Sequence, residues 1–286
     1  MPQKVALTLA SGGAKGFAHI GAIEALEEAG YEITSIAGTS MGALVGGLYA
    51  AGGLDKAKEW MYDLTGKKVF SLADFTLSPH ALLNGNRLMQ ALKAQVPDCN
   101  IEDLNIPFCA VATDLKEGCE YVFRSGSLYD AIRASISIPM LFRPVEMGDM
   151  LLIDGGITNG LPLEHAQRTP GDILVAINLE DYKWEDDQDK PTKAVKAPKS
   201  SRLASLSEKL HKGINALSNN YVSMTYDTIS ILMKRNVELS LRLTPPDLYI
   251  NIDVGQYGSY DYDHAEEISR LGKEQMKQLL ENTHTR

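Results

Sequence analysis

Ser40 lies in the run Gly38-Thr39-Ser40-Met41-Gly42, a Gly-x-Ser-x-Gly pattern that offers a serine hydroxyl as a nucleophile. Residues 33–37 before it are rich in β-branched side chains, and residues 43–51 after it are small and apolar, as in a buried helix. We therefore expect the serine at a sharp strand-to-helix turn, where the helix N-terminus favours developing negative charge. Gly38 and Gly42 leave room for this turn. The alternative is a chance match, because short patterns of this kind are common.

A second glycine-rich run, Ser11-Gly12-Gly13-Ala14-Lys15-Gly16, directly follows the apolar residues 5–10. It does not match a phosphate-binding loop, which needs Gly-Lys followed by Ser or Thr after a longer spacing. It is a weak match to a dinucleotide-binding fingerprint, because no acidic residue ends the second strand. We expect it to form an oxyanion hole, in which backbone N–H groups approach a reacting carbonyl beside Ser40. The expected donors belong to Gly12, Gly13, Ala14 and Lys15.

Asp154 stands out among the acids and histidines that could serve as the base for Ser40. It ends the apolar run 151–153 and precedes Gly155 and Gly156, which leave its carboxylate sterically open. An ordinary Asp-Gly turn is the alternative. Each of the six histidines is expected to be structural or at the surface: His19, His80, His165, His211, His264 and His284. A triad completed by His165 or His264 stays open.

In this order, residues 12–16, 38–42 and 154–156 resemble the three signature motifs of the patatin-like phospholipases. Residues 133–139 and 159–162 also resemble that family. The resemblance covers about residues 5–180. This chain departs from the family pattern at two positions, with Ser11 where glycine is common and Lys15 where arginine is common.

The resemblance implies a three-layer α/β/α fold with a largely parallel central sheet and a Ser-Asp dyad without a catalytic histidine. Ser40 would be the nucleophile and Asp154 the base, with the glycine loop as the oxyanion hole. The motif glycines would be Gly16, Gly38, Gly42, Gly155 and Gly156. No cofactor and no metal is implied.

These residues predict a serine hydrolase that cleaves carboxylic (acyl) esters through an acyl-enzyme, with phospholipid or lysophospholipid acyl chains as the expected substrates. Apolar residues near the Ser-Ile-Pro run are expected to line an acyl pocket, or to belong to the ordinary core: Ile136, Ile138, Met140, Leu141 and Phe142. Two alternatives stay open. One is a lipid-binding or regulatory protein with low turnover on the same fold, and the other is the histidine-dependent esterase.

Strand-like and helix-like segments alternate from the start of the chain, which is typical of a largely parallel sheet covered by helices. Only one clear strand precedes the strand before Ser40, so the chain is a poor match to the α/β-hydrolase fold. We expect strands at 5–10, 33–37, 108–113, 120–123, 172–179 and 248–254, and helices at 17–29, 54–64, 87–95 and 264–281. Asn86 and Ser127 are expected to cap helices, residues 147–150 to turn a hairpin, and residues 70–85 to form a loop.

Three segments are expected within one domain: a catalytic core at 5–180, a charged flexible loop at 181–202, and C-terminal helices and a last strand at 203–286. The charged segment carries acidic residues and then basic residues at a spacing of three from Lys190 to Arg202. We expect it to be a solvated excursion. A basic arm that contacts anionic lipid headgroups is the alternative.

The composition restricts partners and location. A chain of 286 residues with 44% hydrophobic content can bury a large core, and a net charge of -9 argues against a nucleic-acid partner. No apolar run approaches the roughly 20 residues that span a bilayer, and the start of the chain lacks the apolar core of a signal peptide. The three cysteines form no C-x-x-C pair. We expect a cytoplasmic protein with at most peripheral membrane contact, and a homo-oligomer stays open.

Overall fold

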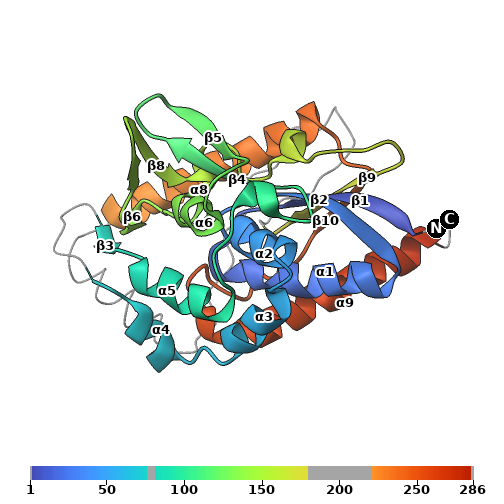
Figure 1. Ribbon diagram of the computed structural model, residues 1–286, viewed down its shortest axis with the longest axis horizontal. Helices are drawn as coiled ribbons and strands as arrows, with labels where there is room; N and C mark the ends of the chain where they lie inside the picture. The colour runs from blue at the N-terminus through green and yellow to red at the C-terminus, as the bar shows by residue number, and fades with distance from the viewer. Residues whose placement is uncertain (1, 76–80, 180–220, 285–286) are drawn as a thin grey trace.

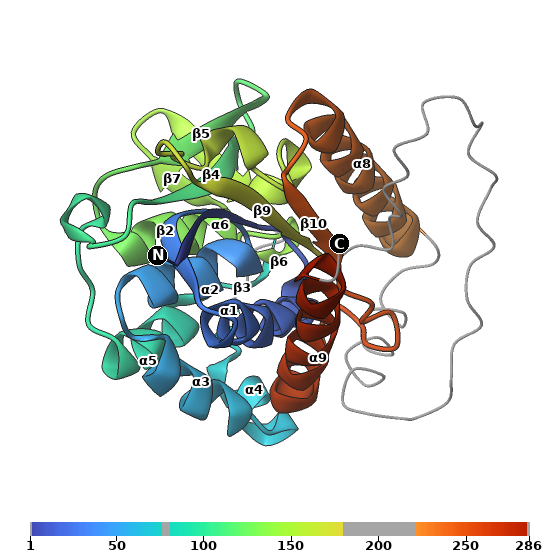
Figure 2. The ribbon, with the colours of Figure 1, turned by 90° about the vertical axis from the view of Figure 1, so that its right-hand side faces the viewer.

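A mixed sheet lies at the centre of the molecule, for which a computed structural model describes residues 2–75, 81–179 and 221–284 (Figures 1 and 2). Its strands are β1 (Gln3–Leu9), β2 (Tyr31–Thr39), β4 (Phe108–Asp114), β5 (Cys119–Phe123), β7 (Val145–Met147), β8 (Met150–Asp154), β9 (Ile173–Asn178) and β10 (Leu248–Asn251). Their order is β10-β9-β1-β2-β4-β8-β7, with β5 also paired to β4. The pairs from β10 to β4 are parallel, and the pairs that add β5, β8 and β7 are antiparallel.

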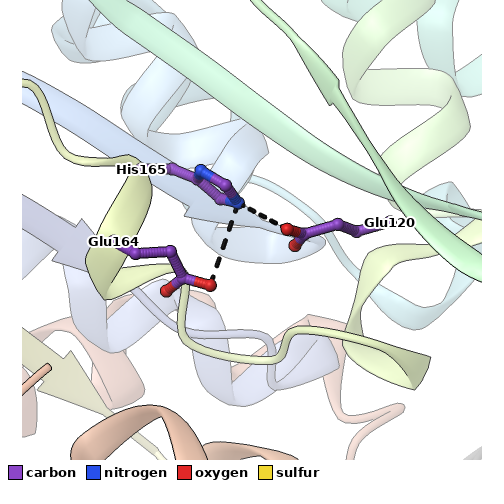
Figure 3. Close-up of side chains that lie close together, drawn as sticks. All are labelled: Glu120, Glu164 and His165. Carbon is purple, nitrogen blue, oxygen red and sulfur yellow. Dashed lines mark hydrogen bonds and ion pairs between the residues drawn. The ribbon is translucent and has the colours of Figure 1, made fainter. Parts of the chain in front are cut away.

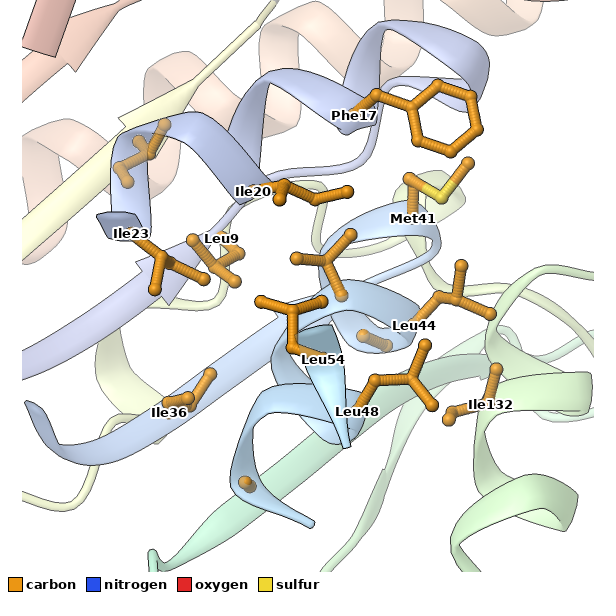
Figure 4. Packing of buried hydrophobic residues seen from close by; sticks show 14 of the residues in the cluster. Leu9, Phe17, Ile20, Ile23, Ile36, Met41, Leu44, Leu48, Leu54 and Ile132 are labelled. Atoms are coloured by element: carbon orange, nitrogen blue, oxygen red, sulfur yellow. The ribbon is translucent and has the colours of Figure 1, made fainter. Parts of the chain in front are cut away.

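Helices cover both faces of this sheet. They are α1 (Ala18–Glu28), α2 (Met41–Ala50), α3 (Leu54–Tyr62), α4 (Gly66–Leu72), α5 (Asn86–Gln95), α6 (Leu128–Ser135), α8 (Tyr221–Leu243) and α9 (Ala265–His284). On one face, Leu7 and Leu9 of β1 belong to the large core that includes residues of α1 and α2 (Figure 4). On the other face, Ala6 packs in a smaller cluster with Val237 and Leu241 of α8. Alternation along β1 thus builds the expected α/β/α layers.

Most of the expected elements are confirmed, with ends shifted by a few residues. Ser127 caps α6, since its side chain accepts a hydrogen bond from the Asp130 N–H at 3.1 Å. The turn between β7 and β8 lies at residues 148–149 and has Gly148 at φ 59°. None of the helices that the structure describes is long and apolar enough to cross a bilayer. The expected loop at 181–202 lies outside the described residues.

Two expectations are wrong. Asn86 is the first residue of α5 rather than its cap, and Gly85 precedes it in the cap position. The carboxylate of Asp74, which is distant in sequence, accepts hydrogen bonds from the N–H groups of Gly85, Asn86 and Arg87 and so satisfies the helix start. Residues 70–85 are not simply a loop, because they include the end of α4 and the strand β3 (Ala81–Leu83). That strand pairs in parallel with β6 (Met140–Phe142).

The helix expected at 264–281 is present as α9, and its charged face lies at the surface. Its other face packs on α1, with Ile268 and Met276 fully buried. The two helices approach closely because each offers a glycine to the other. A Cβ at Gly21 would lie 1.9 Å from the Ser269 carbonyl oxygen, and a Cβ at Gly272 would lie 2.1 Å from the Ala18 carbonyl oxygen.

This contact predicts that Gly21→Ala destabilises the protein by about 3 kcal/mol, because the new methyl group would meet backbone that cannot rotate away. Chemical denaturation would measure the change. Gly255→Ala is the matched control, since a Cβ there would meet nothing closer than the Asp253 carboxylate at 3.4 Å. Equal effects of the two substitutions would contradict the close packing of α1 on α9.

Candidate active site

Ser40 and Asp154 meet because two strands of opposite direction end on one edge of β4. Val111 of β4 pairs with Thr39 of β2 on one side and Val122 of β5 on the other. The next residue, Ala112, pairs with β5 and with Asp154 of β8. At both Val111 and Ala112, β5 occupies one edge of β4, so β2 and β8 must lie on the other edge. Because β2 runs parallel to β4 and β8 runs antiparallel to it, the C-terminal ends of β2 and β8 face each other. The residue after Thr39 is therefore placed beside Asp154.

Ser40 occupies a strained turn between β2 and α2. Its φ is 54°, a left-handed value that is uncommon for a residue other than glycine. Two hydrogen bonds stabilise the turn: the Ser40 N–H donates to Ser135 Oγ at 2.8 Å, and the Ser135 hydroxyl donates to the Val111 carbonyl at 2.6 Å. Space is tight, because a Cβ at Gly42 would lie 2.3 Å from the Leu9 carbonyl oxygen. The predicted elbow geometry is thus present at Ser40.

Asp154 is buried and its carboxylate faces Ser40. Its carboxylate Oδ2 accepts a hydrogen bond from Ser40 Oγ at 2.6 Å, and Oδ1 accepts one from the Gly156 N–H at 2.8 Å. Its backbone is also fixed, by the Ser137 carbonyl and the Thr113 hydroxyl. Asp154 is 2% exposed, and burial raises its pKa to about 6, although the two hydrogen bonds to the carboxylate partly offset this rise. Asp154 is thus a more basic carboxylate than an exposed one.

The glycine loop after β1 lies beside Ser40, as the parallel pairing of β1 with β2 requires. Gly13 and Ser40 line the same pocket, and Gly13 has a φ of 56°. The Ala14 N–H, one of the expected oxyanion donors, donates instead to the Ser259 carbonyl at 2.9 Å. Met41, the first residue of α2, also lines the pocket, so Gly13, Ser40 and Met41 share one site.

An apolar pocket of about 210 Å³ opens above Ser40. Four of the five residues expected to line it do so: Ile136, Ile138, Leu141 and Phe142. Met140 is absent from the lining and is 37% exposed. Sequence reasoning missed most of the wall, which comes from α3, α4, α5 and their flanks. These residues are Trp60, Met61, Leu64, Val69, Phe70, Leu72, Phe75, Leu88 and Leu92.

No histidine among the described residues lines this pocket. His165 Nε2 lies 2.9 Å from Glu120 Oε1 and 3.9 Å from Glu164 Oε1 (Figure 3). His264 pairs with Glu267, and the buried His19 contacts the Ala10 carbonyl, with its pKa lowered to about 4 by burial. His80 and His211 lie outside the described residues, as does the side chain of His284.

Glu120, Glu164 and His165 present ligand atoms within 4.8 Å of one another, close enough to share one metal ion. Hydrogen bonds already account for their closeness, because the Asn159 side-chain amide donates to Glu120 at 2.9 Å and to Glu164 at 2.8 Å. The carbonyl of Asn159 accepts from the Thr39 hydroxyl at 2.8 Å. The cluster thus ties the loop after Asp154 to the end of β2.

The family model of patatin-like phospholipases matches residues 7–166. The chain therefore belongs to the patatin-like phospholipase family. An uncharacterized NTE family protein of Mycobacterium tuberculosis is 46% identical over 176 residues, which cover 62% of this chain and 49% of that protein. Neuropathy target esterase sws of Drosophila melanogaster is 32% identical over 184 residues, which cover 62% of this chain and 13% of that protein. The chain thus matches about half the length of the mycobacterial relative.

Among solved structures, the chain is similar to VipD from Legionella pneumophila, with a TM-score of 0.45 and 15% identity. That match covers 98% of this chain and 67% of VipD.

The buried carboxylate predicts an unusual stability profile. The pKa of Asp154 is raised from 3.8 to about 6 on folding, so its ionisation destabilises the folded state as the pH rises through this interval. Asp154→Asn removes the charge while its amide can still bond Ser40 and the Gly156 N–H. We expect the variant to be more stable than the parent chain at pH 8, by up to about 3 kcal/mol.

Urea denaturation at pH 8 and pH 4 would measure this difference, which should shrink at the lower pH. Asp149→Asn, in the exposed turn between β7 and β8, is the control and should change little. A variant at position 154 that is less stable than the parent chain at pH 8 would contradict the proposed cost of burying this charge.

Proposed function

We propose that this chain is a serine esterase that hydrolyses the acyl esters of lipids through a dyad of Ser40 and Asp154. The observation that carries the proposal is the 2.6 Å hydrogen bond to the buried carboxylate of Asp154 from Ser40 Oγ, a residue that lines an apolar pocket. Membership of the patatin-like phospholipase family supports the same reaction class. One relative is named as an esterase, which agrees with ester hydrolysis.

In the proposed first step, Ser40 Oγ attacks the ester carbonyl carbon while Asp154 Oδ2 takes the hydroxyl proton. The carbonyl oxygen becomes an oxyanion, and the N–H groups of Gly13 and Met41 are the proposed donors that stabilise it. Of the four donors expected from sequence, Ala14 is the least suited, because its N–H already bonds Ser259. When the tetrahedral intermediate collapses, Asp154 returns its proton to the leaving alkoxide and the alcohol departs.

In the proposed second step, water attacks the acyl-enzyme and gives its proton to Asp154. Collapse then frees the carboxylic acid, and the proton passes back to Ser40 Oγ. A carboxylate of ordinary pKa is a weak base, and the rise to about 6 caused by burial brings Asp154 closer to the range that general bases need near neutral pH. Burial therefore has a direct chemical role in this mechanism.

The apolar pocket supports an acyl chain as the group that is bound. Its lining is almost entirely aliphatic or aromatic, so an extended hydrocarbon chain would be removed from water along its length. A polar headgroup finds few partners there and would remain at the mouth. Phospholipids and lysophospholipids both fit this division into apolar and polar parts.

A dyad is favoured over a histidine triad because Ser40 Oγ already donates to Asp154, whereas neither His165 nor His264 lines the pocket that contains Ser40. Ser40→Ala and Asp154→Asn should each lower the rate of hydrolysis of a short-chain nitrophenyl ester by at least about 10³-fold. His165→Ala and His264→Ala should keep most of the activity.

The rate constant kcat/KM of the parent chain should rise through about pH 6 as Asp154 ionises, and then level off. Loss of activity in a folded histidine variant would favour the triad. A folded parent chain that hydrolyses no ester would favour the low-turnover lipid-binding alternative.

The acyl pocket gives a further prediction on chain length. Ile138→Trp should raise KM for long-chain esters by at least about tenfold and spare short ones, because the larger side chain would shorten the pocket that Ile138 lines. A series of esters of increasing chain length would show this. Leu115→Trp, at a residue that is 54% exposed and outside the lining, is the control. Uniform loss across the series would instead indicate a damaged fold.

A further inference from the structure

Two aromatic side chains stand at the mouth of the pocket and face solvent. Phe70 of α4 and Phe75 after it are 55% and 57% exposed, although both also line the pocket that contains Ser40. Their rings contact each other with centroids 5.7 Å apart. The apolar lining of the pocket therefore includes two aromatic side chains that are exposed at the surface. Large exposed apolar side chains that cluster at a pocket are typical of a surface that has a partner.

Three exposed basic side chains lie on α4 and at the start of α5. Lys67 and Lys68 are exposed on α4 itself, one helical turn or less before Phe70. Arg87 of α5 is exposed as well, and its guanidinium donates to the Ser71 carbonyl at the end of α4. Three acids also lie near α4: the Asp74 carboxylate accepts hydrogen bonds at the start of α5, Asp63 lies 3.4 Å from Lys68, and Asp263 is exposed and lines the same pocket.

We propose that α4, with Phe70 and Phe75, docks on the surface of a bilayer that contains anionic lipids. The aromatic rings would enter the boundary between headgroups and acyl chains, and Lys67, Lys68 and Arg87 would contact anionic headgroups. This inference rests on the proposed function, because an acyl chain could then pass from the bilayer into the pocket without crossing water. A lipid surface is favoured over a protein partner because the aromatic pair borders the opening through which an acyl chain must enter.

A second exposed apolar surface serves as an internal comparison. On α8, Leu239 and Leu243 are 53% and 82% exposed, and neither lines the pocket. Docking through α8 would not by itself bring the pocket to the bilayer, because neither leucine lines the pocket. The two surfaces therefore make opposite predictions for the same binding assay.

The test is sedimentation with sucrose-loaded vesicles of phosphatidylcholine, with and without phosphatidylglycerol. The full chain would carry Ser40→Ala, so that no lipid is hydrolysed during the assay. We expect binding to the anionic vesicles and weaker binding to the neutral ones. Phe70→Ser combined with Phe75→Ser should weaken binding to anionic vesicles at least tenfold. Lys67→Glu combined with Lys68→Glu should weaken it to a similar extent, and only where phosphatidylglycerol is present.

Leu239→Ser combined with Leu243→Ser is the matched control and should bind like the Ser40→Ala parent. The proposal is overturned if the parent binds neither kind of vesicle, if the α4 variants bind unchanged, or if the α8 variant loses as much binding as they do. The lysine variant keeps the test decisive should the aromatic variant fail to fold. Binding is measured without turnover, so vesicle binding by the Ser40→Ala chain, together with no ester hydrolysis by the folded chain that keeps Ser40, would reject the proposed function and leave this inference standing.

Discussion

The hydrogen bond between Ser40 Oγ and Asp154 Oδ2 sets the conditions that the rest of the molecule must meet. It needs a strained serine and a buried carboxylate to be held at contact distance, and neither is favourable alone. The sheet supplies the distance, because β2 and β8 end head to head on one edge of β4. The Gly156 N–H supplies the second partner that a buried carboxylate requires. The same burial raises the pKa of Asp154 and makes the carboxylate a better base.

Features with local causes could be predicted from sequence. A β-branched run, a Gly-x-Ser-x-Gly pattern and a small-residue helix predicted the turn at Ser40, whose φ of 54° agrees with it. Ser127 was predicted as a cap, and a hairpin turn was predicted at residues 147–150. In each case the residues that determine the conformation lie within a few positions of it. The parallel pairing of β1 with β2, which brings the glycine loop to Ser40, followed from the alternation of short strands and helices.

Features that depend on distant partners could not be predicted. No local signal shows that β8 shares an edge of β4 with β2, or that Ser135 lies beneath the Ser40 N–H. The Ala14 N–H is not free to act as an oxyanion donor because it bonds the Ser259 carbonyl, which lies more than two hundred residues away in the sequence. The pocket wall from α3 to α5 was missed because its apolar residues have the spacing of ordinary amphipathic helices. Asp74 likewise caps α5 from a position that has no helix signature.

The central claim is that Ser40 becomes covalently bound during turnover and that Asp154 alone activates it. Its most direct test is mass spectrometry of peptides from the protein after reaction with a fluorophosphonate, with the rate of adduct formation followed against pH. We predict a single adduct on the peptide that contains Ser40, formed at a rate that rises through about pH 6 in the parent chain and is abolished by Asp154→Asn. An adduct on another residue, or unchanged labelling of Ser40 in the Asp154→Asn variant, would contradict the account.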